Sequence, residues 1–134
     1  MRANRVFETV LYADDLAAAE RFYGDVLGME VIQKSELFLV FHMVDGVLLI
    51  FEPKQSAESG RTVPSHGMSG EGHIAFAAND KEIDAWQTCL EEKGIVIDEI
   101  HSWEEGGRSL YARDPAGNSV EFAPSTLWGG GWSF

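Results

Sequence analysis

The chain is poor in cysteine and in basic residues. A single cysteine, Cys89, stands among 134 residues, so no intramolecular disulfide and no metal site built from several thiolates is possible. We therefore expect a protein of a reducing compartment, the cytoplasm. Lys and Arg number 10 against 22 Asp and Glu, which gives a net charge of -12 at pH 7. This charge argues against nucleic acids and anionic membrane surfaces as partners.

Long hydrophobic runs are also missing. The most apolar stretch, residues 37–51, is interrupted by His42, Asp45 and Gly46, and it is too short to cross a bilayer. Asp45-Gly46 is instead typical of a β-hairpin turn. No apolar segment follows residues 1–5, so we expect no signal peptide. A hydrophobic fraction of 45% suits one domain with a substantial core.

One β-α-β-β-β pattern occurs twice in the chain. Each copy begins with an alternating strand, at 6–13 and at 72–78. A capped helix follows, ending at Gly28 in the first copy and at Gly94 in the second. A short strand and a hairpin complete each copy, and the predicted parts are module 1 (about 5–53), a polar linking loop (54–71), module 2 (about 72–124) and an aromatic tail (125–134).

The two copies match residue by residue. The spacing between Glu8 and His73 equals the spacing between Asp15 and Asp80. Two later pairs, Gly46/Gly117 and Pro53/Pro124, share a slightly larger spacing. We expect each helix to cover one face of its sheet. The predicted fold is α+β: two tandem modules whose mixed sheets form a cup around a central cleft.

The second hairpin, residues 108–122, carries an unusual carboxylate. Its turn, at 114–118, reads Asp-Pro-Ala-Gly-Asn, and symmetric pairing about this turn places Tyr111 beside Glu121. Alternation adds further polar residues to the same face: Ser109, Arg113 and Ser119. A buried, unpaired carboxylate costs several kcal/mol. Glu121 is therefore on a solvated face, paired with a residue such as Arg113, or bound to a metal.

The repeat brings metal-binding residue types to equivalent positions. Glu8 and His73 occupy the same place in the first strand of each copy, and Glu121 lies in the last strand of the second. The predicted counterpart of Glu121 is Ile50. One imidazole and two carboxylates suit one divalent ion of Fe, Ni, Zn, Mn or Co. Three protein ligands leave coordination positions open for Lewis-acid or O₂ chemistry.

These features resemble the vicinal oxygen chelate superfamily, the family of glyoxalases, bleomycin resistance proteins and extradiol dioxygenases. The matching stretches are 8–16 with Phe22-Tyr23 and Leu27-Gly28, then 72–76, then 113–122. The resemblance implies metal ligands at Glu8, His73 and Glu121. The fourth glyoxalase ligand would fall on Ile50, which cannot bind a metal, and Glu8 departs from the histidine common at the first position.

Several further residues are candidates for the site. The resemblance to the dioxygenases implies an active-site role for Tyr111, as an acid, base or hydrogen-bond donor, and makes His66 a candidate substrate-binding residue. Arg108 and Arg113 would bind a substrate carboxylate or phosphate, or else pair with nearby acids. By strand alternation, Glu52 shares a face with Ile50 and is a candidate for a displaced fourth ligand. His42 is expected on the opposite face from Ile50 and is not a candidate ligand.

Two functions fit these observations. The first is a metal-dependent enzyme whose small substrate chelates the metal through vicinal oxygens: a lyase, an isomerase, a ring-cleaving dioxygenase, or an enzyme that adds a thiol or water. The second is a metal-free binder that sequesters a small aromatic or cationic molecule, as bleomycin resistance proteins do. The resemblance also implies a homodimer. The aromatic tail, with Trp128, Trp132 and Phe134, is expected to cover the cleft or to pack on a second subunit.

Overall fold

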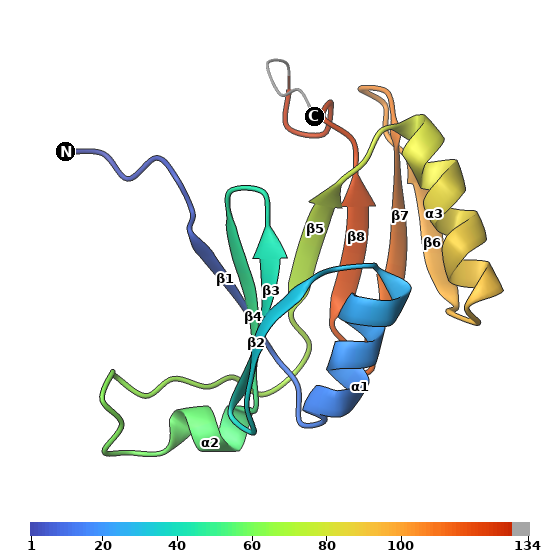
Figure 1. Cartoon of the computed structure of the whole chain (residues 1–134). Helices are drawn as coiled ribbons and strands as arrows, with labels where there is room; N and C mark the ends of the chain where they lie inside the picture. The colour runs from blue at the N-terminus through green and yellow to red at the C-terminus, as the bar shows by residue number, and fades with distance from the viewer. Residues whose placement is uncertain (130–134) are drawn as a thin grey trace. The chain divides into compact units, whose positions relative to one another are not determined.

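The computed structural model describes residues 1–129, which form two units (Figure 1). The first unit is Met1–Gly70, and the second begins at Glu71, at the end of the predicted linking loop. Each unit holds one four-stranded mixed sheet and its own helix, so the predicted α+β fold with two β-α-β-β-β modules is confirmed. No helix in the described part of the chain is both long and apolar enough to span a membrane.

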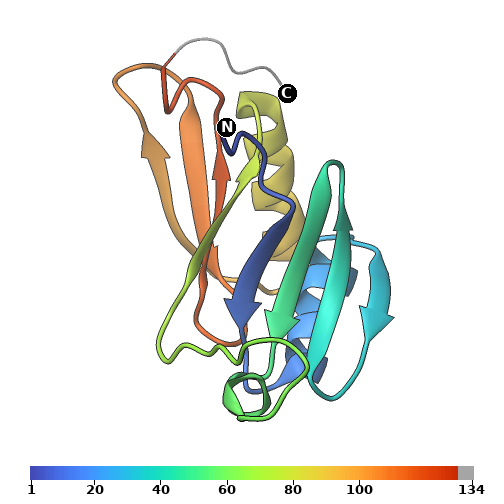
Figure 2. The same ribbon diagram turned by 90° about the vertical axis from the view of Figure 1, so that its left-hand side faces the viewer.

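The first unit contains the sheet β1-β4-β3-β2. Its elements are β1 (Glu8–Tyr12), α1 (Leu16–Glu20), the π-helical turn η1 (Arg21–Val26), β2 (Val31–Lys34), β3 (Phe38–Met43), β4 (Gly46–Phe51) and α2 (Pro53–Ala57). Asp15 begins α1 because its carboxylate accepts a hydrogen bond from the Ala18 backbone N–H at 2.9 Å. Figure 2 shows α1 behind this sheet, which leaves the opposite face open.

Two details of the first unit differ from the sequence prediction. The hairpin turn is formed by Val44 and Asp45, while Gly46 already pairs with Met43 as the first residue of β4. Any side chain at Gly46 would collide with the Phe7 carbonyl. Pro53, which we expected to end the module, instead starts the helix α2, since a proline is well suited to the first helical position.

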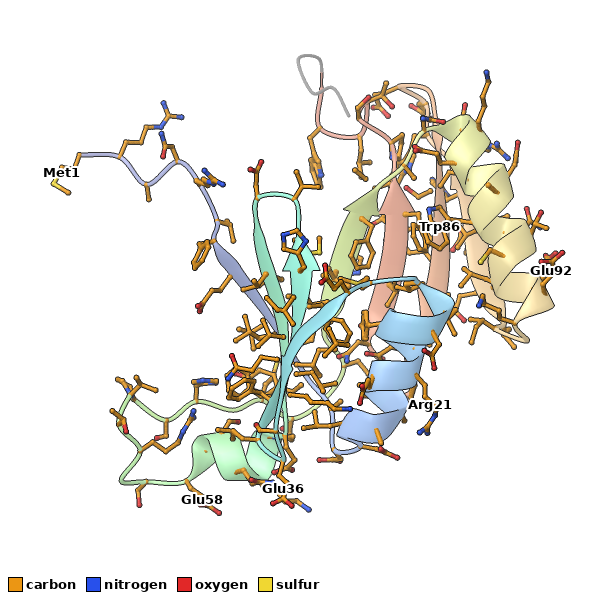
Figure 3. The ribbon with its side chains drawn as sticks, in the orientation of Figure 1. Met1, Arg21, Glu36, Glu58, Trp86 and Glu92 are labelled. Carbon is orange, nitrogen blue, oxygen red and sulfur yellow. The ribbon has the colours of Figure 1, made fainter. Side chains whose placement is uncertain are left out.

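The second unit contains the sheet β5-β8-β7-β6. Its elements are β5 (His73–Ala77), α3 (Asp80–Glu92), β6 (Ile97–Ser102), β7 (Arg108–Arg113) and β8 (Ser119–Ala123). The predicted capping box is present at the start of α3: Asn79 accepts from Glu82 N, and Glu82 accepts from Asn79 N. Trp86 points from α3 towards the sheet (Figure 3) and stacks on Phe122 at 4.5 Å.

Strand alternation gives each sheet a helix-covered face and an open face. In the first unit the buried centre of the covered face is apolar, with Leu39, Phe41, Leu48 and Ile50 at most 2% exposed. In the second unit the corresponding residues are Leu110, Ala112, Val120 and Phe122. Burial of these side chains stabilises each sheet against its helix, at about 25 cal/mol per Å² of apolar surface. The polar residues of interest therefore project from the open faces.

Candidate functional site

The open face of the second unit holds a contiguous group of His73, Glu121 and Tyr111. The strand register places Ala75 and Tyr111 on either side of Glu121, as the sequence predicted for Tyr111. The Tyr111 hydroxyl donates to Glu121 Oε1 at 2.7 Å. His73 Nε2 lies 3.2 Å from the other carboxylate oxygen, Oε2. The carboxylate of Glu121 is buried, with 5% of the residue exposed, while His73 is exposed.

This arrangement excludes Arg113 as the partner of Glu121. One carboxylate oxygen accepts from a phenol and the other lies 3.2 Å from an imidazole nitrogen, whereas the Arg113 guanidinium binds Asp98 at 2.7 Å and Glu71 at 3.2 Å. A buried carboxylate is tolerated where its oxygens are satisfied in this way. The open-face group therefore consists of one acid held by two side chains, one of them a potential metal ligand.

The turn of the second hairpin fixes the start of β5, where His73 lies. Asp114 Oδ1 accepts from the backbone N–H of Asn118 at 2.8 Å, and the Asn118 amide donates to Asp114 Oδ2 at 2.8 Å. Asn118 Oδ1 in turn accepts from Gly72 N at 2.7 Å. Ser119 N donates to the Gly72 carbonyl at 2.9 Å. The residue before His73 is thus held on both sides by the turn that precedes β8.

Tyr111 acts in this group as a hydrogen-bond donor. Burial, followed by its hydrogen bond to Glu121, raises the pKa of the Tyr111 phenol from 10.0 to about 12, while the Ser109 hydroxyl opposes this shift. Burial disfavours the phenolate, and so does the neighbouring carboxylate. Tyr111 consequently keeps its proton at neutral pH and is unsuited to act as a base.

Trp103 is a member of this neighbourhood that the sequence did not reveal. Its indole Nε1–H donates to the fully buried Ser109 hydroxyl at 2.8 Å. Ser109 and Tyr111 are on the same face by alternation, so a polar chain runs from Trp103 through Ser109 to Tyr111 and Glu121. Trp103 precedes β7 in a turn, where neither alternation nor repeat spacing predicts a partner.

The two arginines proposed for substrate binding differ in position. Arg108 lies on the helix-covered face, where it donates to Asp84 Oδ1 at 2.9 Å and to the Asp80 carbonyl at 3.0 Å. Asp84 raises the pKa of Arg108. Arg113 shares the open face with Tyr111, but its ion pairs with Asp98 and Glu71 occupy it. Both arginines show the pairing with nearby acids that was the alternative to substrate binding.

The third predicted ligand, Glu8, belongs to the first unit. It is an exposed residue at the start of β1, where its Cα is opposite Val47. Alternation places it on the open face of its own sheet, together with Val10 and Tyr12. His73 occupies the equivalent place, opposite Ser119, in the second unit. The equivalence of Glu8 and His73 inferred from the sequence thus agrees with both strand registers.

The predicted counterpart of Glu121 is corrected from Ile50 to Leu49. Glu121 is opposite Ala75, two residues after His73, and the residue opposite Val10, two after Glu8, is Leu49. Ile50 is fully buried on the helix-covered face. The error is one residue because the second hairpin has a longer turn than the first. Leu49 is also aliphatic, so the fourth glyoxalase-type ligand is still missing from this position.

Two other expectations that depended on Ile50 change as well. Glu52 is the N-cap of α2 and accepts from the backbone N–H of Lys54 at 3.2 Å and of Gln55 at 2.7 Å, so its carboxylate serves the helix. His42 lies on the opposite face of the sheet from Ile50, as expected, and this is the open face. It is the cross-strand partner of Val47, which in turn is the partner of Glu8. His42 was missed as an open-face residue because alternation was counted from the wrong position.

His66 lies on the first unit, against the last residues of β1 and β4. Its Nδ1 is 2.8 Å from the Tyr12 hydroxyl, and its ring meets the Phe51 ring edge-on at 4.7 Å. Arg61 lies over the same Phe51 ring, with its Cζ 5.8 Å from the ring centroid. Arg61 and Tyr12 were not singled out from the sequence, since no motif marks a loop residue that folds back onto a strand.

Two donor atoms of the second unit lie at a spacing that would suit a shared divalent metal. Ligand atoms about 2.1 Å from one ion, at octahedral or tetrahedral angles, lie roughly 3.0–3.4 Å apart, and His73 Nε2 and Glu121 Oε2 are 3.2 Å apart. Tyr111 holds the other oxygen of Glu121, as hydrogen-bonded partners orient metal-binding carboxylates. Among residues 1–129, no three His, Cys, Asp or Glu side chains converge on one point.

Comparison with known proteins identifies the family. The model of the Glyoxalase/Bleomycin resistance protein/Dioxygenase superfamily matches residues 5–122. The chain therefore belongs to this superfamily, as its sequence resemblance suggested.

The names of individual relatives describe several different activities. A structure of lactoylglutathione lyase from Agrobacterium tumefaciens is 42% identical, with a TM-score of 0.92, and the match covers 97% of this chain and 100% of that one. Catechol-2,3-dioxygenase of Bacillus subtilis is 32% identical over 81% of this chain, which spans only 38% of that relative. Metallothiol transferase FosB of Staphylococcus haemolyticus is 25% identical over 84% of this chain and 78% of its own.

Proposed function

We propose that the chain is a divalent-metal-dependent enzyme whose small substrate binds the metal through two adjacent oxygens. The observation that carries this proposal is the approach of His73 Nε2 to Glu121 Oε2 at 3.2 Å, with Tyr111 donating to the other carboxylate oxygen. Glu8 is the proposed third ligand, on the basis of its equivalence to His73 in the repeat. The ion is one of Fe, Ni, Zn, Mn or Co.

In the proposed site each protein group has a defined task. A bound divalent ion supplies Lewis-acid polarisation of substrate oxygens. Glu121 and His73 hold the ion, and Tyr111 keeps Glu121 in one rotamer by donating to Oε1. Because the pKa of Tyr111 is raised to about 12, its hydroxyl keeps the proton that it donates to Glu121, and its oxygen can accept a hydrogen bond from a substrate hydroxyl. Arg113, bound to two acids, is not assigned a part in catalysis.

For the reaction, we propose the feature that the relatives share, and we leave its type open. Their names span a lyase, a dioxygenase and a thiol transferase, and the aliphatic Leu49 removes one ligand from a four-ligand site. The resemblance to the superfamily implies a substrate that chelates the metal through vicinal oxygens. Such a substrate suits the coordination positions that three protein ligands leave open. A homodimer and a cytoplasmic location remain predictions.

Binding of catechol tests this proposal directly. Catechol has two adjacent hydroxyls, whereas resorcinol has the same two hydroxyls further apart and serves as the matched control. We expect Zn(II)-loaded protein to bind catechol about tenfold or more tightly than resorcinol in calorimetric titrations. Treatment with a chelator should abolish that preference. Equal affinities for the two diols, or a preference that survives the chelator, would contradict chelation of the substrate by a bound metal.

A second candidate, metal-free sequestration of an apolar molecule, has one supporting observation. The second unit has an apolar hollow of about 260 Å³ beside β5. It is lined by Ala75, Phe76, Ala77, Ala123, Pro124, Ser125, Leu127 and Trp128. Trp128 is 82% exposed, while Trp132 and Phe134 of the predicted tail lie outside the described residues. Binding of both diols with chelator present would favour this function.

A further inference from the structure

Arg61, His66 and Tyr12 form a cluster around Phe51 that the proposed metal site does not use. All four residues belong to the first unit. Two come from the segment after α2, which crosses the lower end of the open sheet face in Figure 2. Phe51 and Tyr12 are cross-strand partners at the ends of β4 and β1. The cluster therefore joins a folded-back loop to the strand face that also carries Glu8.

Arg61 is held in place without a carboxylate. Its Nη1 donates to the Ser56 carbonyl at 2.7 Å, and its guanidinium lies over Phe51. None of the ion pairs recorded within residues 1–129 includes Arg61. In a chain of net charge -12, a half-buried guanidinium without an acidic partner is unusual. Its remaining N–H groups form a fork suited to a carboxylate or a phosphate.

His66 is fixed beside this guanidinium. Its backbone N–H donates to the same Ser56 carbonyl, at 3.0 Å, so both side chains start from one anchoring point. The Tyr12 hydroxyl meets Nδ1 at 2.8 Å. With Tyr12 as the donor, the proton of the imidazole is on Nε2, which then becomes a second donor for an anion. The ring is also held perpendicular to Phe51.

The floor between this cluster and Glu8 is apolar. Alternation from Phe51 and Tyr12 places four apolar residues on the same open face, Val10, Val40, Val47 and Leu49, with His42 as a polar exception at the Glu8 end. Phe38 extends the floor, with its ring centroid 5.5 Å from that of Phe51. Glu8 and Tyr12 are four residues apart on one strand, or roughly 13 Å. A molecule on the order of 10 Å long could thus reach from one end of the face to the other.

We propose that Arg61 and His66 bind the anionic group of the substrate, and that Phe51 and the apolar floor receive its aromatic or aliphatic body. The substrate class is thus a small apolar acid, a carboxylate or a phosphate ester, with its chelating oxygens at the other end. This assignment refines the proposed function, on which it rests for the position of the metal end. It differs from the cationic molecule named as an alternative in the sequence analysis, because Arg61 is a cation that none of the ion pairs within residues 1–129 includes.

Benzoate binding to the metal-free protein tests this assignment. Chelator-treated protein is titrated with benzoate, benzyl alcohol and benzylamine, which share one ring and differ in charge, while NMR signals of Arg61, His66 and Phe51 are followed. We expect benzoate to bind about tenfold or more tightly than benzyl alcohol. Arg61→Gln should remove that difference, and Arg61→Lys should retain part of it because the charge remains. Arg21→Gln, a change at an exposed arginine on η1 (Figure 3), should have no effect.

The outcomes separate this assignment from the proposed function. Benzoate affinity no better than that of benzyl alcohol, or equal losses in Arg61→Gln and Arg21→Gln, would overturn the anion site. Tyr12→Phe gives an independent reading, since it frees the His66 ring without changing charge and should weaken benzoate binding several-fold. Metal titration of Arg61→Gln should match the wild type. A failure of metal binding in both proteins would refute the metal site and leave the benzoate result standing.

Discussion

At the scale of single residues, Glu121 is the centre of the candidate site. It is a buried acid in the middle of a strand, and its two oxygens have different partners, Tyr111 and His73. A buried carboxylate destabilises the fold unless partners such as these satisfy its oxygens. Hairpin symmetry predicted the pairing of Tyr111 with Glu121, and the repeat spacing predicted the position of His73, so all three residues could be identified from the sequence. The sequence could not identify Trp103, Arg61 or Tyr12, whose contacts depend on how turns and loops fold back.

Replacing Tyr111 by Phe should destabilise the protein modestly. The substitution removes one hydrogen bond to a buried carboxylate and leaves Glu121 Oε1 without its donor. We expect a loss of about 1–2 kcal/mol in the free energy of unfolding at pH 7, measured by urea denaturation. Tyr111→Phe should retain the metal ligands, so a complete loss of metal would show that Tyr111 is itself a ligand.

The same variant should reveal the raised pKa of Tyr111. A phenol whose pKa is raised on folding, here from 10.0 to about 12, favours the folded state while it is protonated. This contribution is fully present below pH 10 and is lost as the pH rises through about 12. In metal-free protein, the stability difference between wild type and Tyr111→Phe should stay constant up to about pH 10 and then shrink. A difference that stays constant, or grows, as the pH rises from 10 to about 12 would contradict the raised pKa.

The corrected strand register gives a paired test at two neighbouring residues. Leu49 lies on the open face and Ile50 is fully buried beneath the sheet. Leu49→Glu should therefore fold, with a loss of about 1–2 kcal/mol. Ile50→Glu places a charge in the core and should cost about 4 kcal/mol or more. Thermal and urea unfolding distinguish them, and the reverse order of stability would show that the sequence-based assignment of Ile50 was right.

At the scale of elements, local signals were predicted well. The capping box at Asn79 and the symmetric second hairpin were both expected, because short-range side-chain to backbone bonds determine them. The helix α2 was missed because Pro53 was interpreted only as a terminator. The linked error at Ile50 arose because repeat spacing was carried through turns of unequal length. Insertions in turns shift strand register without leaving a mark in hydrophobic periodicity.

The second hairpin turn should be important for stability, unlike the first. Asn118 is 1% exposed and bonds both Asp114 and Gly72, next to His73. Asn118→Ala should cost about 2–3 kcal/mol, because it leaves buried polar groups without partners. Asp45→Ala, in the exposed turn of the first hairpin, breaks only the surface ion pair with Arg5 and should change stability by less than about 0.5 kcal/mol. Equal effects in the two variants would contradict the structural role assigned to the Asn118 turn.

At the scale of the whole molecule, family and fold class followed from the sequence, whereas the relation between the two units did not. The repeat predicted two β-α-β-β-β modules, and each unit has that topology. Glu8 and the His73–Glu121 pair are in different units, so the three-ligand site is a prediction of the repeat. The cup-shaped cleft expected between the sheets also stays a prediction. Sequence periodicity describes modules and contains no information on how two modules dock.

The predicted homodimer can be measured on the intact chain. Near the start of β1, Val6 is 73% exposed and Phe7 is 67% exposed, an apolar stretch that a second copy would shield from water. Light scattering should give twice the chain mass of 14.8 kDa. A Val6→Ser, Phe7→Ser double variant should dissociate. Val44→Ser, at a turn residue that is 96% exposed, should remain dimeric, and a monomeric wild type would refute the prediction.

The metal content of purified protein tests the central claim most directly. Protein prepared without chelator, and offered each of the five ions, is analysed for bound metal in wild type, His73→Ala, Glu8→Gln and His101→Ala. His101 is the matched control because it also lies beside a carboxylate, with Nδ1 3.3 Å from Glu99. We expect about one ion per chain in wild type and in His101→Ala, and a large loss of metal in His73→Ala and Glu8→Gln. Equal metal in wild type and His73→Ala, or none in wild type, would contradict that claim.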